Sequence, residues 1–285
     1  MRVGYNPHKD KEHKIEDYLH QIVIPVFIPN LEGYFSQSLQ VFEYCLESLW
    51  ATVHEKTFIT IVNNGSCKEV KEYIDTNHKN GKIHEVIHTV NVGKLNSVLK
   101  GLVGHHFPLV TISDSDVLFC SGWQQATSDV FINFPKAGVV GLTPQFKMFE
   151  NGCGNVIAEN LFSKVMQFSK VKNPKALELF YESIGWDTNY NHDYLKYTLA
   201  ISNNQCEALI GSGHFVATYK KSLFDEVTSY IGYKMGGNSE GYLDVAALQK
   251  GLWRLCTAEN YAYHMGNVPE DWMKDELQRS KAVFH

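Results

Sequence analysis

The sequence predicts an α/β protein built around a mostly parallel, doubly wound sheet. Between residues 21 and 143, short apolar runs alternate with longer runs whose apolar residues recur at helical spacing. Strands that alternate with helices form βαβ units, which build a parallel sheet covered by helices on both faces. The chain has 285 residues, of which 44% are hydrophobic, and this is enough to bury one large core.

The elements of this first half follow one another in regular order. Short β-branched runs bounded by polar residues predict strands at 21–27, 58–62, 84–89, 109–113 and 137–143. Apolar residues at helical spacing predict helices at 34–53, 68–79 and 95–103. Polar loops at 29–32, 63–66 and 114–116 each follow a strand, so in a parallel sheet they share its carboxyl edge.

The second half has a less regular pattern. Two runs of helix-forming residues, at 158–171 and 174–184, predict a helical insertion over 144–207. Residues 207–219 predict two strands joined by a glycine turn, and a helix is expected to run to about Gly251. The chain then divides into an N-terminal extension (1–20), the α/β half (21–143), the insertion (144–207) and a final part of the same domain (208–285).

Composition excludes several classes of protein. A net charge of −5 and a pI near 6.2 give no electrostatic basis for binding nucleic acid. No apolar run is long enough to span a bilayer, and the polar N-terminus lacks a segment of signal-peptide type. The six cysteines form no Cys-x-x-Cys pair, which indicates reduced thiols and a cytoplasmic protein rather than a disulfide framework or a zinc site.

The strongest chemical signal is Asp114-Ser115-Asp116, where an apolar run ends on two carboxylates one residue apart. Carboxylates at the end of a buried strand can hold a hard divalent cation, and the cation can hold a diphosphate. The sequence has no Gly-x-Gly-x-x-Gly after a strand and no Gly-Lys-Ser/Thr, which disfavours dinucleotide enzymes and P-loop ATPases. Asp and Ser also favour ordinary turns, so a plain turn is the alternative.

Six short stretches share motifs with one enzyme family, in the family's own order. They are residues 22–27, 45–49, 61–66, 91–102, 112–119 and 121–123. Residues 91–102 are similar to its GKxxALNxGL motif, and residues 112–119 to its LDSDxxF motif. Through these motifs the first half of the chain resembles the family 2 glycosyltransferases, which have the GT-A fold.

This resemblance implies a nucleotide-diphosphate-sugar donor. The implied donor-binding residues are Pro25, Val26, Phe27, Asn63, Asn64, Gly93, Lys94, Asn96, Asp114 and Ser115. The loop at Asn63-Asn64 would hydrogen-bond the base, although the family usually has Asp at one of the two positions. An Asn accepts through its amide oxygen but donates as well. We expect a UDP-sugar, and the alternative for Asn63-Asn64 is a plain turn.

The resemblance also implies a metal site formed by Asp114, Asp116 and His264. The family often has a His after its last strand that completes the site, and His264 occupies a similar position in an HxGN motif. A neutral imidazole suits Mn²⁺ better than Mg²⁺, so we expect Mn²⁺. A purely structural role is the alternative for His264.

An inverting sugar transfer needs a carboxylate that accepts the proton of the attacking hydroxyl. The family's base lies eleven residues before a glycine that opens the next strand, and counting back from Gly251 reaches Glu240. We predict Glu240 as the catalytic base and Asp244 as its competitor. Alternatively, both acids merely favour the N-terminus of a helix.

Three residues are candidates for the acceptor side. Trp186 has an aromatic ring that can stack on a sugar face, and Gly213 lies in a GxGxF motif where backbone can approach a sugar. His214 can hydrogen-bond a hydroxyl. Packing in the core of the insertion is the alternative for Trp186, and a structural role is the alternative for His214.

The function expected from these features is an inverting, metal-dependent glycosyltransferase that moves a sugar from a nucleotide-diphosphate donor to a hydroxyl of a saccharide or glycolipid. A cell-surface polysaccharide pathway and a location in the cytoplasm, or at the inner membrane surface, are expected at the level of the family. One alternative is a nucleotide-sugar-binding protein without catalysis. Another is a sugar-phosphate nucleotidyltransferase, although residues 28–33 lack the basic residues of its phosphate loop.

Overall fold

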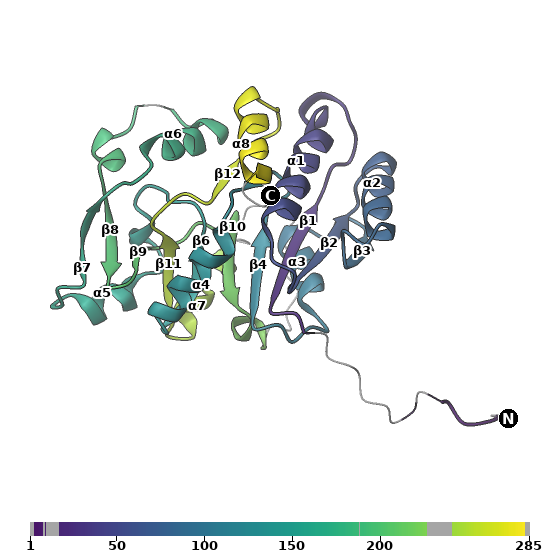
Figure 1. The fold of residues 1–285 in the computed structure, drawn as a ribbon, viewed down its shortest axis with the longest axis horizontal. Helices are drawn as coiled ribbons and strands as arrows, with labels where there is room; N and C mark the ends of the chain where they lie inside the picture. Colours follow the sequence, from purple (N-terminus) through teal and green to yellow (C-terminus); the bar gives the residue numbers. More distant parts are fainter. Residues whose placement is uncertain (1–2, 8, 10–16, 188, 227–240, 283–285) are drawn as a thin grey trace.

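A computed structural model describes residues 3–7, 9, 17–187, 189–226 and 241–282. Within these ranges the chain forms one large sheet with the order β3-β2-β1-β4-β10-β6-β11-β9-β8-β7 (Figure 1). Its strands are β1 (His20–Val26), β2 (Thr57–Asn64), β3 (Glu85–Thr89), β4 (Leu109–Ser113), β6 (Ala137–Gly141), β7 (Met166–Lys170), β8 (Tyr197–Ser202), β9 (Glu207–Ile210), β10 (Val216–Lys220) and β11 (Trp253–Thr257). Strands β7, β9 and β10 run opposite to the others, so the sheet is mixed and mostly parallel.

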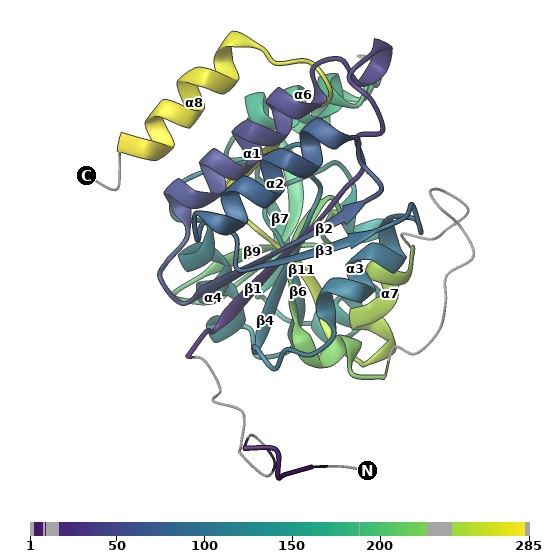
Figure 2. The ribbon, with the colours of Figure 1, turned by 90° about the vertical axis from the view of Figure 1, so that its right-hand side faces the viewer.

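Helices cover both faces of this sheet (Figure 2). They are α1 (Ser38–Thr52), α2 (Lys68–Lys79), α3 (Lys94–Leu102), α4 (Trp123–Asn133), α5 (Gly154–Asn160), α6 (Pro174–Ser183), α7 (Gly241–Gln249) and α8 (Asp271–Ala282). Short 3-10 helices are η1 (Gly33–Phe35), η2 (Met148–Glu150), η3 (His192–Leu195) and η4 (Lys221–Phe224). None of the helices in the described part of the chain is long and apolar enough to cross a membrane.

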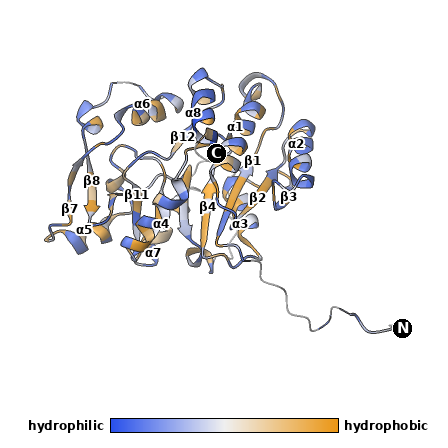
Figure 3. Cartoon of the chain, in the orientation of Figure 1, coloured by the Kyte–Doolittle hydropathy of each residue, from blue (hydrophilic) through white to orange (hydrophobic). Residues whose placement is uncertain are grey.

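The alternation of side chains along β1 explains the two-sided core. Ile22 and Ile24 pack with α1 and α2, whereas Val23 packs with α3 and α7 on the opposite face. All three side chains are fully buried. A central strand buried on both faces must be apolar at consecutive positions, which is why its sequence reads as a continuous hydrophobic run. Figure 3 shows β1 and β4 as largely hydrophobic, while the helices carry hydrophilic residues.

The elements predicted in the first half are present in the predicted order, and strand 109–113 and helix 68–79 have the predicted bounds. Two elements between the strands predicted at 109–113 and 137–143 were missed, namely a short strand at Val117–Phe119 and helix α4. The predicted strands at 207–219 are confirmed as β9 and β10. Strand β10 lies between β4 and β6 and is antiparallel to both. Strands β10 and β11, from the last part of the chain, therefore lie in the same sheet as the strands of the first half.

The predicted helical insertion, residues 144–207, is only partly helical. Residues 144–207 contain α5 and α6, but they also contain β7 and β8, which extend the sheet beyond β9. The run at 158–171 forms helix only to Asn160, and β7 follows, with Met166 paired to Ile201. In β7 the apolar residues Met166 and Phe168 alternate with polar ones, a two-residue period that favours a strand.

A small second sheet lies beside the Asp114-Ser115-Asp116 loop. Strand β5 (Val117–Phe119) follows β4 almost at once and pairs with β12 (Ala262–His264) in antiparallel register, His264 opposite Val117. This pairing brings the segment after β12 next to the Asp114-Ser115-Asp116 loop. The amide of Met265 donates to the carbonyl of Asp116 at 2.8 Å.

Candidate active site

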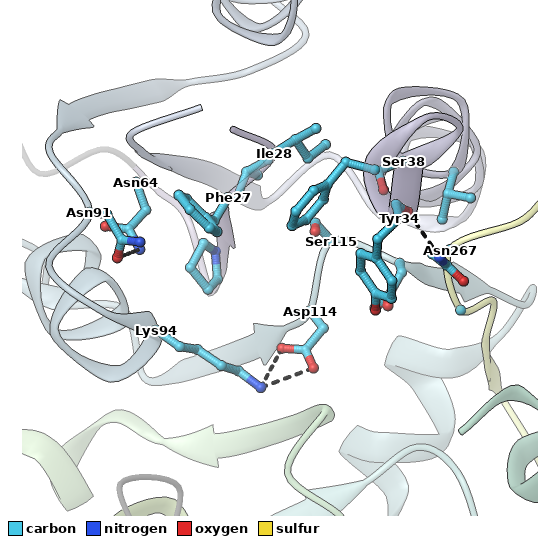
Figure 4. Close-up of a pocket in the computed structure, with 16 residues that line it drawn as sticks. Phe27, Ile28, Tyr34, Ser38, Asn64, Asn91, Lys94, Asp114, Ser115 and Asn267 are labelled. Carbon is cyan, nitrogen blue, oxygen red and sulfur yellow. Dashed lines mark hydrogen bonds and ion pairs between the residues drawn. The ribbon is translucent and has the colours of Figure 1, made fainter. Parts of the chain in front are cut away.

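A cavity of about 500 Å³ opens at the carboxyl edge of the parallel strands, where ligands of open α/β sheets bind (Figure 4). Its walls come from the end of β1, from η1 and the start of α1, from the loops after β2, β3 and β4, and from the segment after β12. The lining residues are Pro25, Val26, Phe27, Ile28, Tyr34, Phe35, Ser38, Val41, Asn64, Asn91, Lys94, Asp114, Ser115, Asp116, Gly266 and Asn267.

Of the ten predicted donor residues, seven line this cavity. They are Pro25, Val26, Phe27, Asn64, Lys94, Asp114 and Ser115. Three further lining residues were not predicted to contact the donor: Tyr34, Asn91 and Asn267. Tyr34 and Asn267 lie on the opposite side of the cavity from Asn64, and the Asn267 amide donates to the carbonyl of Tyr34 at 2.9 Å (Figure 4). This contact joins residues 233 positions apart, so no local sequence pattern announces it.

The two asparagines that end β2 have different surroundings. Asn63 accepts from the Ser66 amide at 2.9 Å, and its amide group contacts His88 Nδ1 at 3.0 Å. Asn64 accepts from the Val92 amide at 2.8 Å and lines the cavity. Consecutive residues of a strand point in opposite directions, so only one of the two can face the cavity. Asn63 is a structural residue of this loop.

The loop between β3 and α3 is held in a fixed shape. Gly93 precedes α3 with φ +90°, a left-handed value that favours glycine. The Asn91 side chain accepts from the Gly93 amide at 3.1 Å, and the Asn96 amide group donates to the Val92 carbonyl at 2.8 Å. Gly93 and Asn96 do not line the cavity; they shape the loop that presents Asn91 and Lys94.

The two acids after β4 have different partners. Lys94 Nζ lies 2.7 Å from Asp114 Oδ1 and 2.9 Å from its Oδ2, so it holds the carboxylate by both oxygens (Figure 4). Asp116 has a looser neighbour, His264, whose Nε2 is 3.4 Å from Asp116 Oδ2. Asp116 Oδ1 is buried and has no hydrogen-bond partner among the described residues.

Burial raises the pKa of Asp116 above its usual value, and the nearby Asp114 carboxylate raises it further, while His264 and Lys94 lower it. A buried carboxylate with an unpartnered oxygen is costly, and a cation beside it relieves that cost. Carboxylate oxygen and imidazole nitrogen are also the donor atoms that Mn²⁺ accepts. Asp116 and His264 therefore fit a divalent metal.

The third predicted ligand, Asp114, is engaged by Lys94. In the described ranges, no cluster of three or more Asp, Glu, His or Cys side chains is arranged to hold a metal. A metal held by Asp116 and His264 would take its other ligands from solvent or from phosphate oxygens of a bound nucleotide.

Of the two candidate bases, only Asp244 lies among the described residues. Glu240 lies outside the described residues. Asp244, in the first turn of α7, makes an ion pair at 2.7 Å with Arg254, whose side chain is only 4% exposed. Asp244 Oδ1 also lies 3.3 Å from His214 Nδ1. Arg254 donates further to the carbonyls of Asn151 and Ser212, so Asp244 is bound to a buried arginine that also holds two backbone carbonyls.

The acceptor candidates fall into two groups. Gly213 and His214 lie between β9 and β10, beside Phe215, whose carbonyl accepts from the Asp114 amide at 2.8 Å. A Cβ at Gly213 would lie 2.2 Å from the end of the Gln145 side chain, which would have to move to make room for it. Trp186 follows α6 and is 56% exposed, with one face stacked on Tyr181 at 4.8 Å between ring centroids.

No protein-family model matches the sequence, and no curated protein matches it. Solved structures do match its fold. One is residues 1–349 of Staphylococcus aureus TarS in complex with UDP-GlcNAc, at 12% identity and a TM-score of 0.50, covering 93% of this chain and 66% of that one. Another is the mannosyltransferase PcManGT of Pyrobaculum calidifontis in complex with GDP-Man and Mn²⁺, at 12% identity and a TM-score of 0.51, covering 97% and 68%.

The chain has the GT-A fold. At 12% identity the likeness extends to the fold, and this chain spans about two thirds of the length of the two matched chains.

Proposed function

We propose that this protein is an inverting, metal-dependent glycosyltransferase that transfers a sugar from a nucleotide-diphosphate donor to a hydroxyl of a saccharide or glycolipid. One observation carries the proposal. At the edge of a GT-A sheet, one cavity combines apolar and amide groups suited to a nucleoside with the carboxylate of Asp116. This carboxylate has a histidine neighbour and a buried oxygen that no described residue hydrogen-bonds.

In this proposal the nucleoside binds between the end of β1 and the loop carrying Asn64 and Asn91. Phe27 supplies an apolar surface, and the two amide side chains lie next to each other on the cavity wall (Figure 4). Asn64 already accepts from the Val92 amide, but an amide oxygen has two lone pairs and can accept from a base as well. A pyrimidine imide N–H matches that acceptor, which supports UDP as the donor nucleotide.

Asp116 and His264 would hold the metal, and Mn²⁺ suits this oxygen and nitrogen set. When bound, such a cation neutralises the negative charge that builds on a departing nucleoside diphosphate. Lys94 also lines the cavity, where it is paired with Asp114. A bound phosphate would compete with Asp114 for the Lys94 ammonium group, which could then stabilise the same charge.

The attacking hydroxyl needs a general base on the acceptor side. The spacing to Gly251 supports Glu240, and the contacts of Asp244 support the same choice, because Arg254 and His214 already occupy its carboxylate. The exposed face of Trp186 supports a role in stacking on an acceptor sugar, and His214, at 35% side-chain exposure, can contact a hydroxyl.

The test combines binding and chemistry on the full chain. Melting temperature is measured with UDP, GDP and ADP, each with and without Mn²⁺, since a ligand that binds the folded state raises it. We expect UDP with Mn²⁺ to give the largest shift, and slow Mn²⁺-dependent hydrolysis of a UDP-sugar to follow. Binding without any hydrolysis or transfer would instead indicate a nucleotide-sugar-binding protein, and no nucleotide binding would contradict the proposal.

A further inference from the structure

We infer that Ser183, the last residue of α6, is a positioning residue that sets the tautomer and ring orientation of His264. The inference rests on the proposed metal-dependent function, which it deepens by bringing the insertion into the metal site. Ser183 Oγ lies 2.9 Å from His264 Nδ1, and the two residues are 81 positions apart in the chain.

The direction of this hydrogen bond follows from the second partner of Ser183. Its Oγ lies 2.6 Å from the carbonyl oxygen of Phe180, which can only accept. The single hydroxyl proton of Ser183 is therefore donated to Phe180. Toward His264 the Ser183 oxygen can only accept, so His264 Nδ1 carries the proton.

A neutral imidazole protonated at Nδ1 has its lone pair at Nε2. That atom is the one 3.4 Å from Asp116 Oδ2. A second hydrogen bond that fixes which ring nitrogen is free is a common way to prepare a histidine for metal binding. Ser183 thus turns the lone pair of His264 toward the carboxylate proposed as the other ligand.

Packing holds the ring in the same orientation. Phe180 and Phe215 both meet the His264 ring edge-on, at interplanar angles of 78° and 84°, and the His264 side chain is 16% exposed. The end of α6 approaches closely because the residue two after His264 is Gly266, where a Cβ would lie 3.3 Å from the Ser183 carbonyl oxygen. Replacing Ser183 therefore removes one hydrogen bond from a ring that its neighbours still confine.

The experiment uses the full chain with ¹⁵N-labelled histidine and needs no activity. In metal-free protein near pH 7.5, NMR spectra that correlate ring nitrogens with ring protons identify the tautomer of His264, and loss of its signals in His264→Ala provides the assignment. We expect wild type to show the Nδ1–H form. Ser183→Ala should lose this preference and bind Mn²⁺ roughly 10- to 100-fold more weakly, measured by calorimetry.

Ser183→Thr keeps the hydroxyl and should retain both the tautomer and the Mn²⁺ affinity. Ser163→Ala is the matched control, because Ser163 also donates to the carbonyl three residues before it but has no histidine partner. An Nε2–H or doubly protonated His264 in wild type would overturn the inference, whether or not the alanine variant folds. Unchanged spectra and affinity in Ser183→Ala would overturn it too, whereas an Nδ1–H tautomer in a protein without Mn²⁺ affinity would overturn only the metal part of the proposed function.

Discussion

At the scale of single residues, the two acids after β4 have different tasks although one residue separates them. Lys94 forms an ion pair with Asp114, while Asp116 Oδ1 is buried and has no hydrogen-bond partner in the described part of the chain. The ion pair of Asp114 needs no further cation, whereas a cation bound at Asp116 would offset the cost of its buried oxygen. The motif therefore combines one acid already in an ion pair with one that remains available to bind a metal.

We predict that Asp116→Asn abolishes the Mn²⁺-dependent part of nucleotide binding and leaves the fold intact. The amide removes a buried charge that lacks full compensation, so the melting temperature of the metal-free variant should equal or exceed that of wild type. Calorimetry with Mn²⁺ and UDP, together with thermal melts, measures both effects. Undiminished Mn²⁺ dependence in this variant would exclude Asp116 as a ligand.

A second prediction separates the two candidate bases. Glu240→Gln keeps the shape of the side chain but cannot accept a proton, so transfer should fall roughly 10²-fold or more with donor binding little changed. Asp244→Asn should act on stability instead, lowering the free energy of unfolding by about 1–3 kcal/mol, because the buried Arg254 loses its charged partner.

Both variants are assayed for transfer and unfolded with urea. If Asp244→Asn is inactive but stable while Glu240→Gln turns over normally, the spacing argument from Gly251 is wrong and Asp244 is the base.

At the scale of elements, the insertion at residues 144–207 both extends the sheet and contacts the candidate metal site. Its strands β7 and β8 extend the sheet, and its helix α6 contacts β12 through Ser183 and His264. Aromatic residues from α6 and from the segments before and after it pack together, and Tyr181 stacks on both Phe146 and Trp186. This packing covers one face of the Trp186 ring and leaves the side chain 56% exposed.

We predict that Trp186→Ala raises KM for a saccharide acceptor roughly 2- to 10-fold, the range expected when one aromatic stacking contact is lost. Donor affinity and kcat should change little, because Trp186 does not line the nucleotide cavity. Initial rates over a series of acceptor concentrations give both constants. Trp50→Ala is the control: this tryptophan packs against Lys82, away from the cavity. Equal KM values in wild type and Trp186→Ala would rule out the stacking role.

At the scale of the whole molecule, a buried polar network ties the N-terminal end of the sheet together. His20 Nε2 contacts Thr111 Oγ1 at 2.7 Å, and its Nδ1 contacts the Gln124 amide group at 3.1 Å, which joins β1, β4 and α4. Burial, with a smaller contribution from His54, lowers the pKa of His20 from 6.5 to about 3. The folded protein therefore keeps His20 neutral where the unfolded chain would bind a proton.

It follows that stability decreases as pH falls below about 6.5. Between the unfolded and folded pKa values the unfolded state binds one more proton, so the free energy of unfolding loses up to about 1.4 kcal/mol per pH unit, and the loss levels off near the folded pKa. Urea unfolding at pH 7.5, 6.5, 5.5 and 4.5 measures it. His20→Gln should flatten the slope, whereas His192→Gln, at an exposed position, should not. Identical slopes in wild type and His20→Gln would show that His20 does not cause the loss of stability at low pH.

Sequence periodicity predicted most elements of the first half of the chain because each of them has a local pattern, although it missed β5 and α4. Helix α2 has an apolar face that repeats within twelve residues, and β4 is a short apolar run that ends on acids, so both were predicted with their observed bounds. The same locality placed the loops after β1, β2 and β4 at one edge, since parallel strands require it. The candidate site could be located to this extent from the sequence.

Long-range pairing decided the rest. The sequence of β10 does not indicate that it enters the sheet between β4 and β6, and its position depends on strands about 80 to 100 residues earlier in the chain. The same is true of Asp114 bound by Lys94 and of His264 turned by Ser183. By itself the sequence indicated the candidate site residues and the edge of the sheet at which the loops after β1, β2 and β4 lie. Only the tertiary structure decided which of them face one another, because that depends on the pairing and packing of segments with no shared local pattern.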